Sequence, residues 1–121
     1  MKRFYLREIA HSRAGDKGDI SNVSVISYDP RDYALILEQI TAEKVKKHFK
    51  GLVKGEVVRY ELPNLHALNF VMHQALGGGV TRSLSHDPHG KSYSALILTI
   101  PVGIPDERAR ELEERGVHEL P

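Results

Sequence analysis

Hydrophobic and polar positions alternate in several short segments of this chain, which predicts β-strands. The alternation is nearly strict in residues 20–28 and looser in residues 4–10 and 56–62. Residues 93–102 form the most apolar segment and predict a buried strand, and residues 80–86 predict a further one. These five segments indicate a chain that builds a substantial sheet.

Helical spacing of apolar residues separates the strands. Asp29 and Pro30 suit an N-cap and a first helical position, and apolar side chains then recur with helical spacing to residue 40. A second, lysine-rich helix begins at Thr41 and ends at Gly51 or Gly55, with its lysines facing water. Two more helices are predicted, over residues 65–76 and over the highly charged residues 106–115, where Gly116 is a natural stop.

Strands and helices mixed in one small chain predict an α+β fold, a two-layer sandwich in which helices cover a mixed or antiparallel sheet. We expect residues 1–102 to form this domain and residues 103–121 to form a charged helical tail. Apart from Ala109 and Leu112, the predicted tail helix is polar, so it buries too little to be held by the core. It is therefore either a solvated tail or a helix that packs on a partner chain.

Composition narrows the possible functions. The chain has 121 residues, 17 Lys and Arg against 16 Asp and Glu, and no cysteine. This size predicts one domain, and the lack of cysteine excludes disulfides, thiolate nucleophiles and iron–sulfur clusters. The near-neutral balance argues against a nucleic-acid-binding role, and no apolar run reaches the length of a membrane span or a signal peptide core. We expect a cytoplasmic protein.

The polar segment 11–19 links two predicted strands and is longer than a hairpin requires. Gly15 and Gly18 let backbone amides turn toward a ligand, cations here can pair with an anion, and carboxylates can act as a base, orient the cations or bind a metal. The alternative is a long exposed turn whose charges pair with one another. The candidate residues of this segment and the following strand are Arg13, Asp16, Lys17, Asp19 and Asn22.

A run of three glycines follows the third predicted helix. Three ordered glycines carry a large entropic cost, which favours a close approach of the backbone to a ligand or another chain. Arg82 lies three residues further on and adds an anion-binding group. The alternative is a helix C-cap followed by a flexible loop. The candidate ligand-binding residues here are Gly77, Gly78, Gly79 and Arg82.

His66, Asn69 and His73 fall on one face of the predicted helix 65–76, and this face has no Lys or Glu. Such a face can line a pocket or an interface, and the alternative is an ordinary neutral surface or subunit contact. The two histidines are too far apart for the usual metal-binding pair, so no metal site is predicted. Residues 86–89 predict a turn, and no cofactor is predicted.

Three motifs in fixed order carry a family resemblance: HSRAGDKGDISN at residues 11–22, RYELPNLHALNF at 59–70 and ALGGGVTRSL at 75–84. From about residue 6 to residue 102 the chain resembles the C-terminal domain of the acyclic terpene utilisation protein AtuA. The resemblance implies a ferredoxin-like fold. It also implies a link to bacterial pathways that degrade branched or terpenoid acids as acyl-CoA thioesters, and a separate large AtuA-type subunit as partner. It assigns no catalytic residue.

From these features we expect a small subunit or accessory domain of an acyl-CoA-related catabolic enzyme, and a homo-oligomer. Arg13, Lys17 and Arg82 would hold an anionic group such as a carboxylate or a CoA phosphate, and Asp16 or His66 would be the base. Two alternatives remain at this point. One is a stand-alone hydratase or lyase that completes its site at subunit boundaries, and the other is a non-catalytic oligomerisation module. The sequence leaves open whether the chain is an enzyme.

Overall fold

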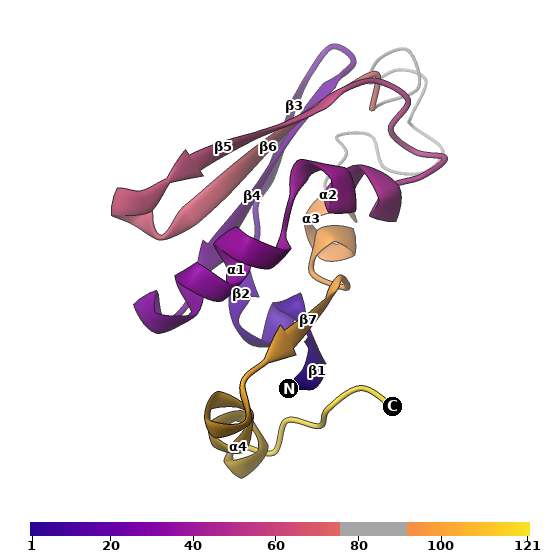
Figure 1. Ribbon diagram of the computed structural model, residues 1–121. Helices are drawn as coiled ribbons and strands as arrows, with labels where there is room; N and C mark the ends of the chain where they lie inside the picture. The colour runs from indigo at the N-terminus through magenta and orange to yellow at the C-terminus, as the bar shows by residue number, and fades with distance from the viewer. Residues whose placement is uncertain (76–91) are drawn as a thin grey trace.

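The computed structural model describes residues 1–75 and 92–121 (Figure 1), so the predicted strand 80–86 and turn 86–89 lie outside the described residues. The strands are β1 (Lys2–Tyr5), β2 (Ala10–His11), β3 (Ala14–Lys17), β4 (Ile20–Ser27), β5 (Val57–Leu62), β6 (Ala67–His73) and β7 (Pro101–Ile104). The helices are α1 (Tyr33–Gln39), α2 (Ala42–His48), α3 (Ser92–Ile97) and α4 (Asp106–Glu114), with short 3₁₀ turns at Leu6–Glu8, Pro30–Asp32 and Pro63–Leu65.

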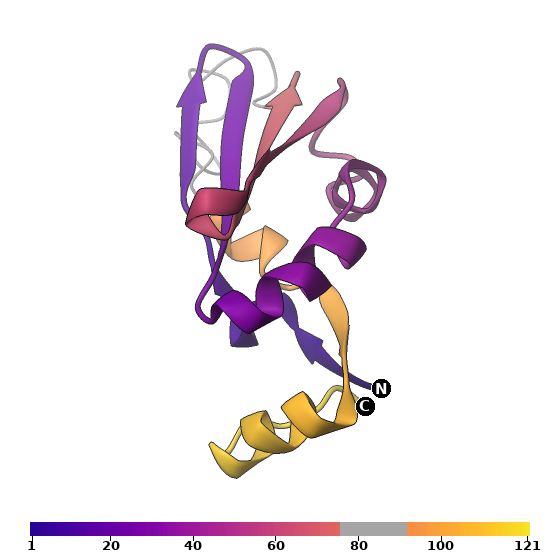
Figure 2. The same ribbon diagram turned by 60° about the vertical axis from the view of Figure 1, so that its left-hand side comes forward.

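Every strand pair in the described residues is antiparallel. The larger sheet has the order β2-β4-β6-β5, and β3 pairs with the first half of β4. The smaller sheet is the ribbon of β1 and β7. Helices α1, α2 and α3 supply apolar side chains to one face of the larger sheet, and both chain ends lie near the ribbon (Figures 1 and 2). The α+β sandwich predicted from the sequence is confirmed.

The predicted loop at residues 11–19 is wrong. β2 and β3 keep one continuous register along β4 and form an edge strand that is interrupted only at residues 12–13. At the interruption the Ser24 hydroxyl accepts the Arg13 N–H at 3.0 Å. A tight turn through Gly18, whose φ is +61°, joins β3 to β4. The polar composition misled the prediction, because an edge strand needs only one apolar face.

The predicted helix 65–76 is also wrong, and with it the shared helical face of His66, Asn69 and His73. This segment is the central strand β6, which pairs with β4 on one side and β5 on the other. Leu68, Phe70 and Met72 alternate inward and are fully buried. Backbone pairing on both edges outweighs the helical spacing that Leu65, Leu68 and Met72 happen to share.

The predicted strand 93–102 divides into α3 and β7. Tyr93 and Ile97, four residues apart, are both buried on the inner face of α3. An apolar run of this length fits a buried helix as well as a buried strand, so its composition alone does not determine its secondary structure. The predicted strand 4–10 likewise divides into β1 and β2, separated by the turn at Leu6–Glu8.

The predicted N-caps Asp29 and Thr41 are confirmed, because each side chain accepts a backbone N–H at the start of a helical segment. The Asp29 carboxylate accepts the Arg31 N–H at 2.9 Å at the head of the 3₁₀ turn that leads into α1. The Thr41 hydroxyl accepts the Lys44 N–H at 3.1 Å and caps α2. Both helices cover the sheet and contribute to one core, whose largest buried side chains are Phe4, Leu6, Ile9, Ile36, Ile40, Phe49, Leu68, Phe70, Met72, Ile97, Ile100 and Ile104.

The predicted C-terminal helix is confirmed as α4, but the interpretation that it buries too little for the core to hold it is wrong. Ala109 and Leu112 are fully buried in the core cluster. Arg108 pairs with the buried Asp32 carboxylate through bonds of 3.0 and 2.9 Å. Two small apolar contacts and one buried ion pair therefore attach a helix whose composition resembles that of a solvated tail. None of the described helices combines the length and apolar character needed to cross a membrane.

Candidate functional site

The larger sheet presents a second face, opposite the helices, which we call the outer face. Along β4, Val23 and Val25 point into the core and are fully buried, whereas Asn22 points outward and is exposed. The same alternation in β5 and β6 turns every second side chain outward. By register the outer face consists of His11, Arg13, Gly15, Lys17, Ile20, Asn22, Ser24, Ile26, Val58, Tyr60, Leu62, Ala67, Asn69, Val71 and His73. Its charged side chains, Arg13 and Lys17, lie on the edge strand.

The centre of the outer face carries amides, a hydroxyl and apolar groups without charge. One cross-strand row runs from Ser24 through Asn69 to Tyr60, and the neighbouring row joins Asn22, Val71 and Val58. Tyr60 is 53 % exposed. A charge-free centre with an exposed aromatic is typical of the core of a protein–protein interface. The centre of this surface can therefore be buried against a partner without leaving an unpaired charge in the interface.

Four of the predicted site residues lie on this face, Lys17 at its hairpin end and three nearer its centre. Asn22 and Asn69 occupy adjacent rows of β4 and β6. Arg13 lies opposite Ser24 at the β3 edge, where its N–H and its carbonyl oxygen both bond to Ser24. These bonds fix the backbone from which the exposed Arg13 side chain extends. A guanidinium at the rim of an uncharged surface can pair with a carboxylate of a partner.

The acidic residues of the same motif lie elsewhere. Asp16 pairs with the fully buried Ser21 on the helix-covered side of the sheet, where it is half-buried. Lys17 pairs with Ile20 at the end of the hairpin and is exposed on the outer face. Asp19 lies in the turn, and its carbonyl oxygen accepts the Ala75 N–H at 3.0 Å. The motif thus divides between the two sides of the sheet and its hairpin turn.

His66 lies at the opposite end of the sheet from Asp16. It precedes β6 in a left-handed conformation with φ of +50°, and its ring lies edge-on to Tyr33 at 5.8 Å. Burial raises the pKa of the Tyr33 phenol, which donates to the Ala67 carbonyl at 3.0 Å. The partners of Asp16 and Ala67 on β4 are five residues apart, about 17 Å at strand spacing. The two predicted base residues therefore do not share one site within a single copy.

The remaining predicted residues, Gly77, Gly78, Gly79 and Arg82, lie outside the described residues. Within residues 1–75 and 92–121, no group of three or more His, Asp or Glu side chains is arranged to hold a metal ion.

Sequence reasoning missed the β5 contribution to the outer face. Val58, Tyr60 and Leu62 alternate with Val57, Arg59 and Glu61. Arg59 points to the inner side, where its guanidinium donates to the Leu37 carbonyl at 2.7 Å at the end of α1. The sequence carried a signal for this face. Apolar residues alternate with Arg59 and Glu61 along the strand, and such alternation indicates that one face of the strand is apolar.

The antiparallel sheet with helices on one face defines a two-layer α+β domain. The family model of the AtuA ferredoxin-like domain matches residues 4–103, and the chain belongs to this family. The resemblance found in the three sequence motifs is thereby confirmed. No curated protein and no solved structure matches the chain.

Proposed function

We propose that this chain is the small subunit or accessory module of a catabolic enzyme for acyl-CoA thioesters of branched acids, and that it docks on a large AtuA-type subunit through the outer face. Membership of the AtuA ferredoxin-like domain family supports the choice of partner. The observation that carries the docking surface is the exposed, charge-free centre of the outer face, where Tyr60 is 53 % exposed. Ile20, which is 40 % exposed, adds apolar area at the hairpin end beside Lys17.

The composition of this face favours a protein partner over a small ligand. Its rows are formed by residues on three paired strands and lie on an open sheet face, whereas small-molecule sites are concave. Exposed Tyr60 and Ile20 can bury apolar area, and Asn22 and Asn69 can hydrogen-bond across the interface. Arg13 at the rim would improve orientation and association rate more than affinity.

Co-expression of the chain with an AtuA-type large subunit tests this proposal. We expect a stable complex by native mass spectrometry and light scattering, and its loss in the Tyr60→Arg variant, because a guanidinium would be buried against the partner without a counter-charge. Leu52→Arg is the matched control, since Leu52 is 48 % exposed and follows α2, away from the sheet. Thermal unfolding verifies that both variants fold.

Two results would overturn the proposal. One is the absence of any complex with the wild-type chain, or a complex that Tyr60→Arg leaves intact. The other is self-association of the isolated chain that Tyr60→Arg abolishes, which would assign the outer face to a homo-oligomer instead.

A further inference from the structure

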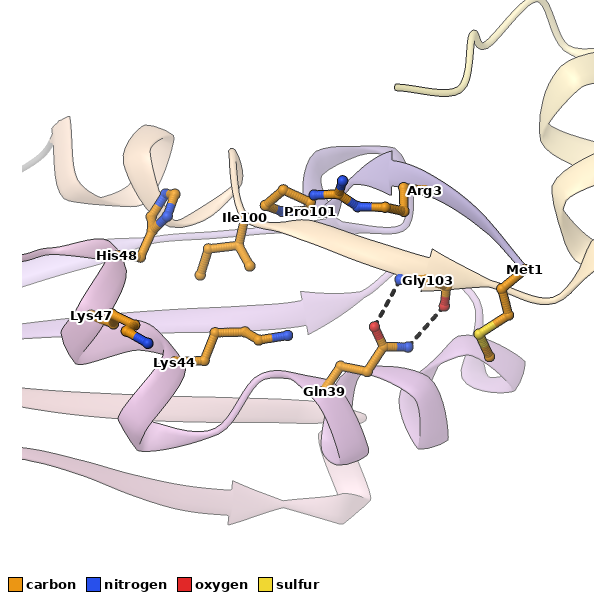
Figure 3. A pocket seen from close by; sticks show the side chains of 9 residues that line it. All are labelled: Met1, Arg3, Gln39, Lys44, Lys47, His48, Ile100, Pro101 and Gly103. Atoms are coloured by element: carbon orange, nitrogen blue, oxygen red, sulfur yellow. Dashed lines mark hydrogen bonds between the residues drawn. The ribbon is translucent and has the colours of Figure 1, made fainter. Parts of the chain in front are cut away.

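A second surface, on the far side of α2 from the sheet, has a different chemistry. A groove of about 700 Å³ lies between α2 and the β1–β7 ribbon (Figure 3). Arg3, Lys44, Lys47 and His48 line it, and we call it the basic groove. Its volume falls within the range of small-molecule sites, about 300–1,000 Å³.

The cations of the basic groove have no carboxylate partner in the described part of the chain and gather on one concave surface. Several other cations pair with carboxylates, as Lys2 does with Glu113 at 2.9 Å and Arg108 with Asp32 at 2.9 Å. Among the residues that the structure describes, Lys46 and Lys50 are unpaired as well, but they do not line the groove. Within the described residues, no carboxylate lies within 4.0 Å of the side-chain nitrogens of Arg3, Lys44 or Lys47, and none lines the groove. In a nearly neutral chain, this grouping leaves a concave surface with positive charge and no internal counter-ion.

Side-chain bonds hold the two walls of the groove at a fixed separation. The Gln39 amide donates to the Gly103 carbonyl at 2.8 Å and accepts the Gly103 N–H at 2.7 Å, which ties the end of α1 to β7 (Figure 3). His48 Nε2 lies 3.1 Å from the Leu96 carbonyl and 2.9 Å from the Thr99 hydroxyl oxygen, which ties α2 to the segment before β7. Sites held by rigid elements bind with a smaller ordering cost.

These bonds also assign the His48 tautomer. The Leu96 carbonyl can only accept, and the Thr99 hydroxyl already donates to it at 2.6 Å. His48 Nε2 therefore carries a hydrogen and donates, so the ring stays oriented by the α3–β7 connection. Lys44 and Lys47, three residues apart on α2, lie on one side of the helix, and Lys44 reaches along the groove toward Gln39 (Figure 3).

We propose that the basic groove binds a ligand that carries two linked phosphates. A single phosphate carries a charge of about −1.5 to −2, so the three cations Arg3, Lys44 and Lys47 match a diphosphate better than a lone phosphate. Arg3 offers a planar fork of donors for phosphate oxygens, and the lysines act as point charges. The half-buried Pro101 forms an apolar wall beside them that can contact an organic group attached to the diphosphate. The proposal is independent of the partner that binds the outer face.

Calorimetric titration of the untagged full chain with inorganic pyrophosphate and with ADP tests the proposal. We expect both to bind at low ionic strength, and the double variant Lys44→Gln/Lys47→Gln to bind about tenfold or more weakly. The matched control is Lys46→Gln/Lys50→Gln, which removes the same charge from neighbouring positions of the same segment without touching the lining of the groove. We expect it to stay within about twofold of the wild type.

Comparison of the two probes shows whether the groove recognises the diphosphate alone or also the organic group attached to it. Equal affinities would indicate recognition of the diphosphate alone, and tighter binding of ADP would indicate contact with the apolar wall; both support the proposal. Absence of binding by the wild-type chain would overturn it. Equal weakening by the two double variants would also overturn it. Binding would then depend on the net charge of the protein and not on the cations that line the groove.

Discussion

One buried ion pair contributes strongly to the attachment of α4, and its removal gives a large, calculable effect. In Arg108→Met the Asp32 carboxylate, whose side chain is 2 % exposed, loses a guanidinium that is itself 11 % exposed. Breaking a buried pair by removing one partner costs about 3–5 kcal/mol, because the remaining charge stays desolvated. For a domain of this size the loss lowers Tm by about 10–20 °C.

Lys2→Met is the matched control, because Lys2 and Glu113 are 38 % and 37 % exposed in their own ion pair. An exposed pair contributes about 0–1 kcal/mol. Urea unfolding of both variants, followed by circular dichroism, measures the two free energies of unfolding. Adding Asp32→Asn to Arg108→Met should restore part of the loss, since a neutral amide is less costly to bury than a carboxylate.

The reasoning fails if Arg108→Met costs no more than Lys2→Met. That result would mean that α4 is a solvated tail and that its contacts with the turn at Pro30–Asp32 contribute nothing to folding. Failure of Asp32→Asn to restore any stability would contradict the assigned cause, even if the loss itself were large.

Three further predictions concern backbone positions and acid stability. Gly55→Ala should cost about 1–3 kcal/mol by urea unfolding, because the added Cβ would lie 2.6 Å from the His73 carbonyl oxygen of β6, and backbone cannot move aside as a flexible side chain does. Gly116→Ala should cost about 1–2 kcal/mol in the same assay, because Gly116 ends α4 with a φ of +87°. Hydrogen bonds from the Arg31 side chain and N–H lower the pKa of Asp29 from 3.8 to about 2, so this stabilisation is complete above the higher value and is lost as the pH falls toward the lower one. Asp29→Asn should therefore flatten the decline of the urea midpoint between these two pH values; an unchanged slope would contradict the assignment.

Local signals predicted the parts of the fold that local chemistry determines. The alternation of residues 20–28 identified β4, and the side-chain caps at Asp29 and Thr41 located the start of the first two helical segments. Gly116 was recognised as the end of α4, where its N–H donates to the Glu113 carbonyl and that of Val117 to the Leu112 carbonyl. These features depend on residues within a few positions of one another.

Long-range pairing determined what the sequence pattern left ambiguous. Leu68, Phe70 and Met72 alternate with period two, but Leu65, Leu68 and Met72 also fit helical spacing, and the position of β6 between two strands decided the outcome. In the same way the core contacts of Ala109 and Leu112 with distant elements attach a helix that looks solvated in sequence.

The candidate site shows the same division. The motif around Arg13 and Asn22 was recognised, but its residues separate because successive positions of a strand face opposite sides. Asn69 joins Asn22 only through the β4–β6 register, and Tyr60 enters through the β5–β6 register. A local pattern can show that one strand has an apolar face, but it does not show which strands combine into one surface.

Hydroxyl-radical footprinting of the chain, alone and with an AtuA-type large subunit, tests the docking surface most directly. The account predicts that labelling of Tyr60, Ile20 and Leu62 falls on complex formation while Leu52, exposed outside the face, keeps its reactivity. Unchanged labelling of the outer face in a verified complex, or protection of Leu52 instead, would contradict the proposal that this sheet face is where the module docks.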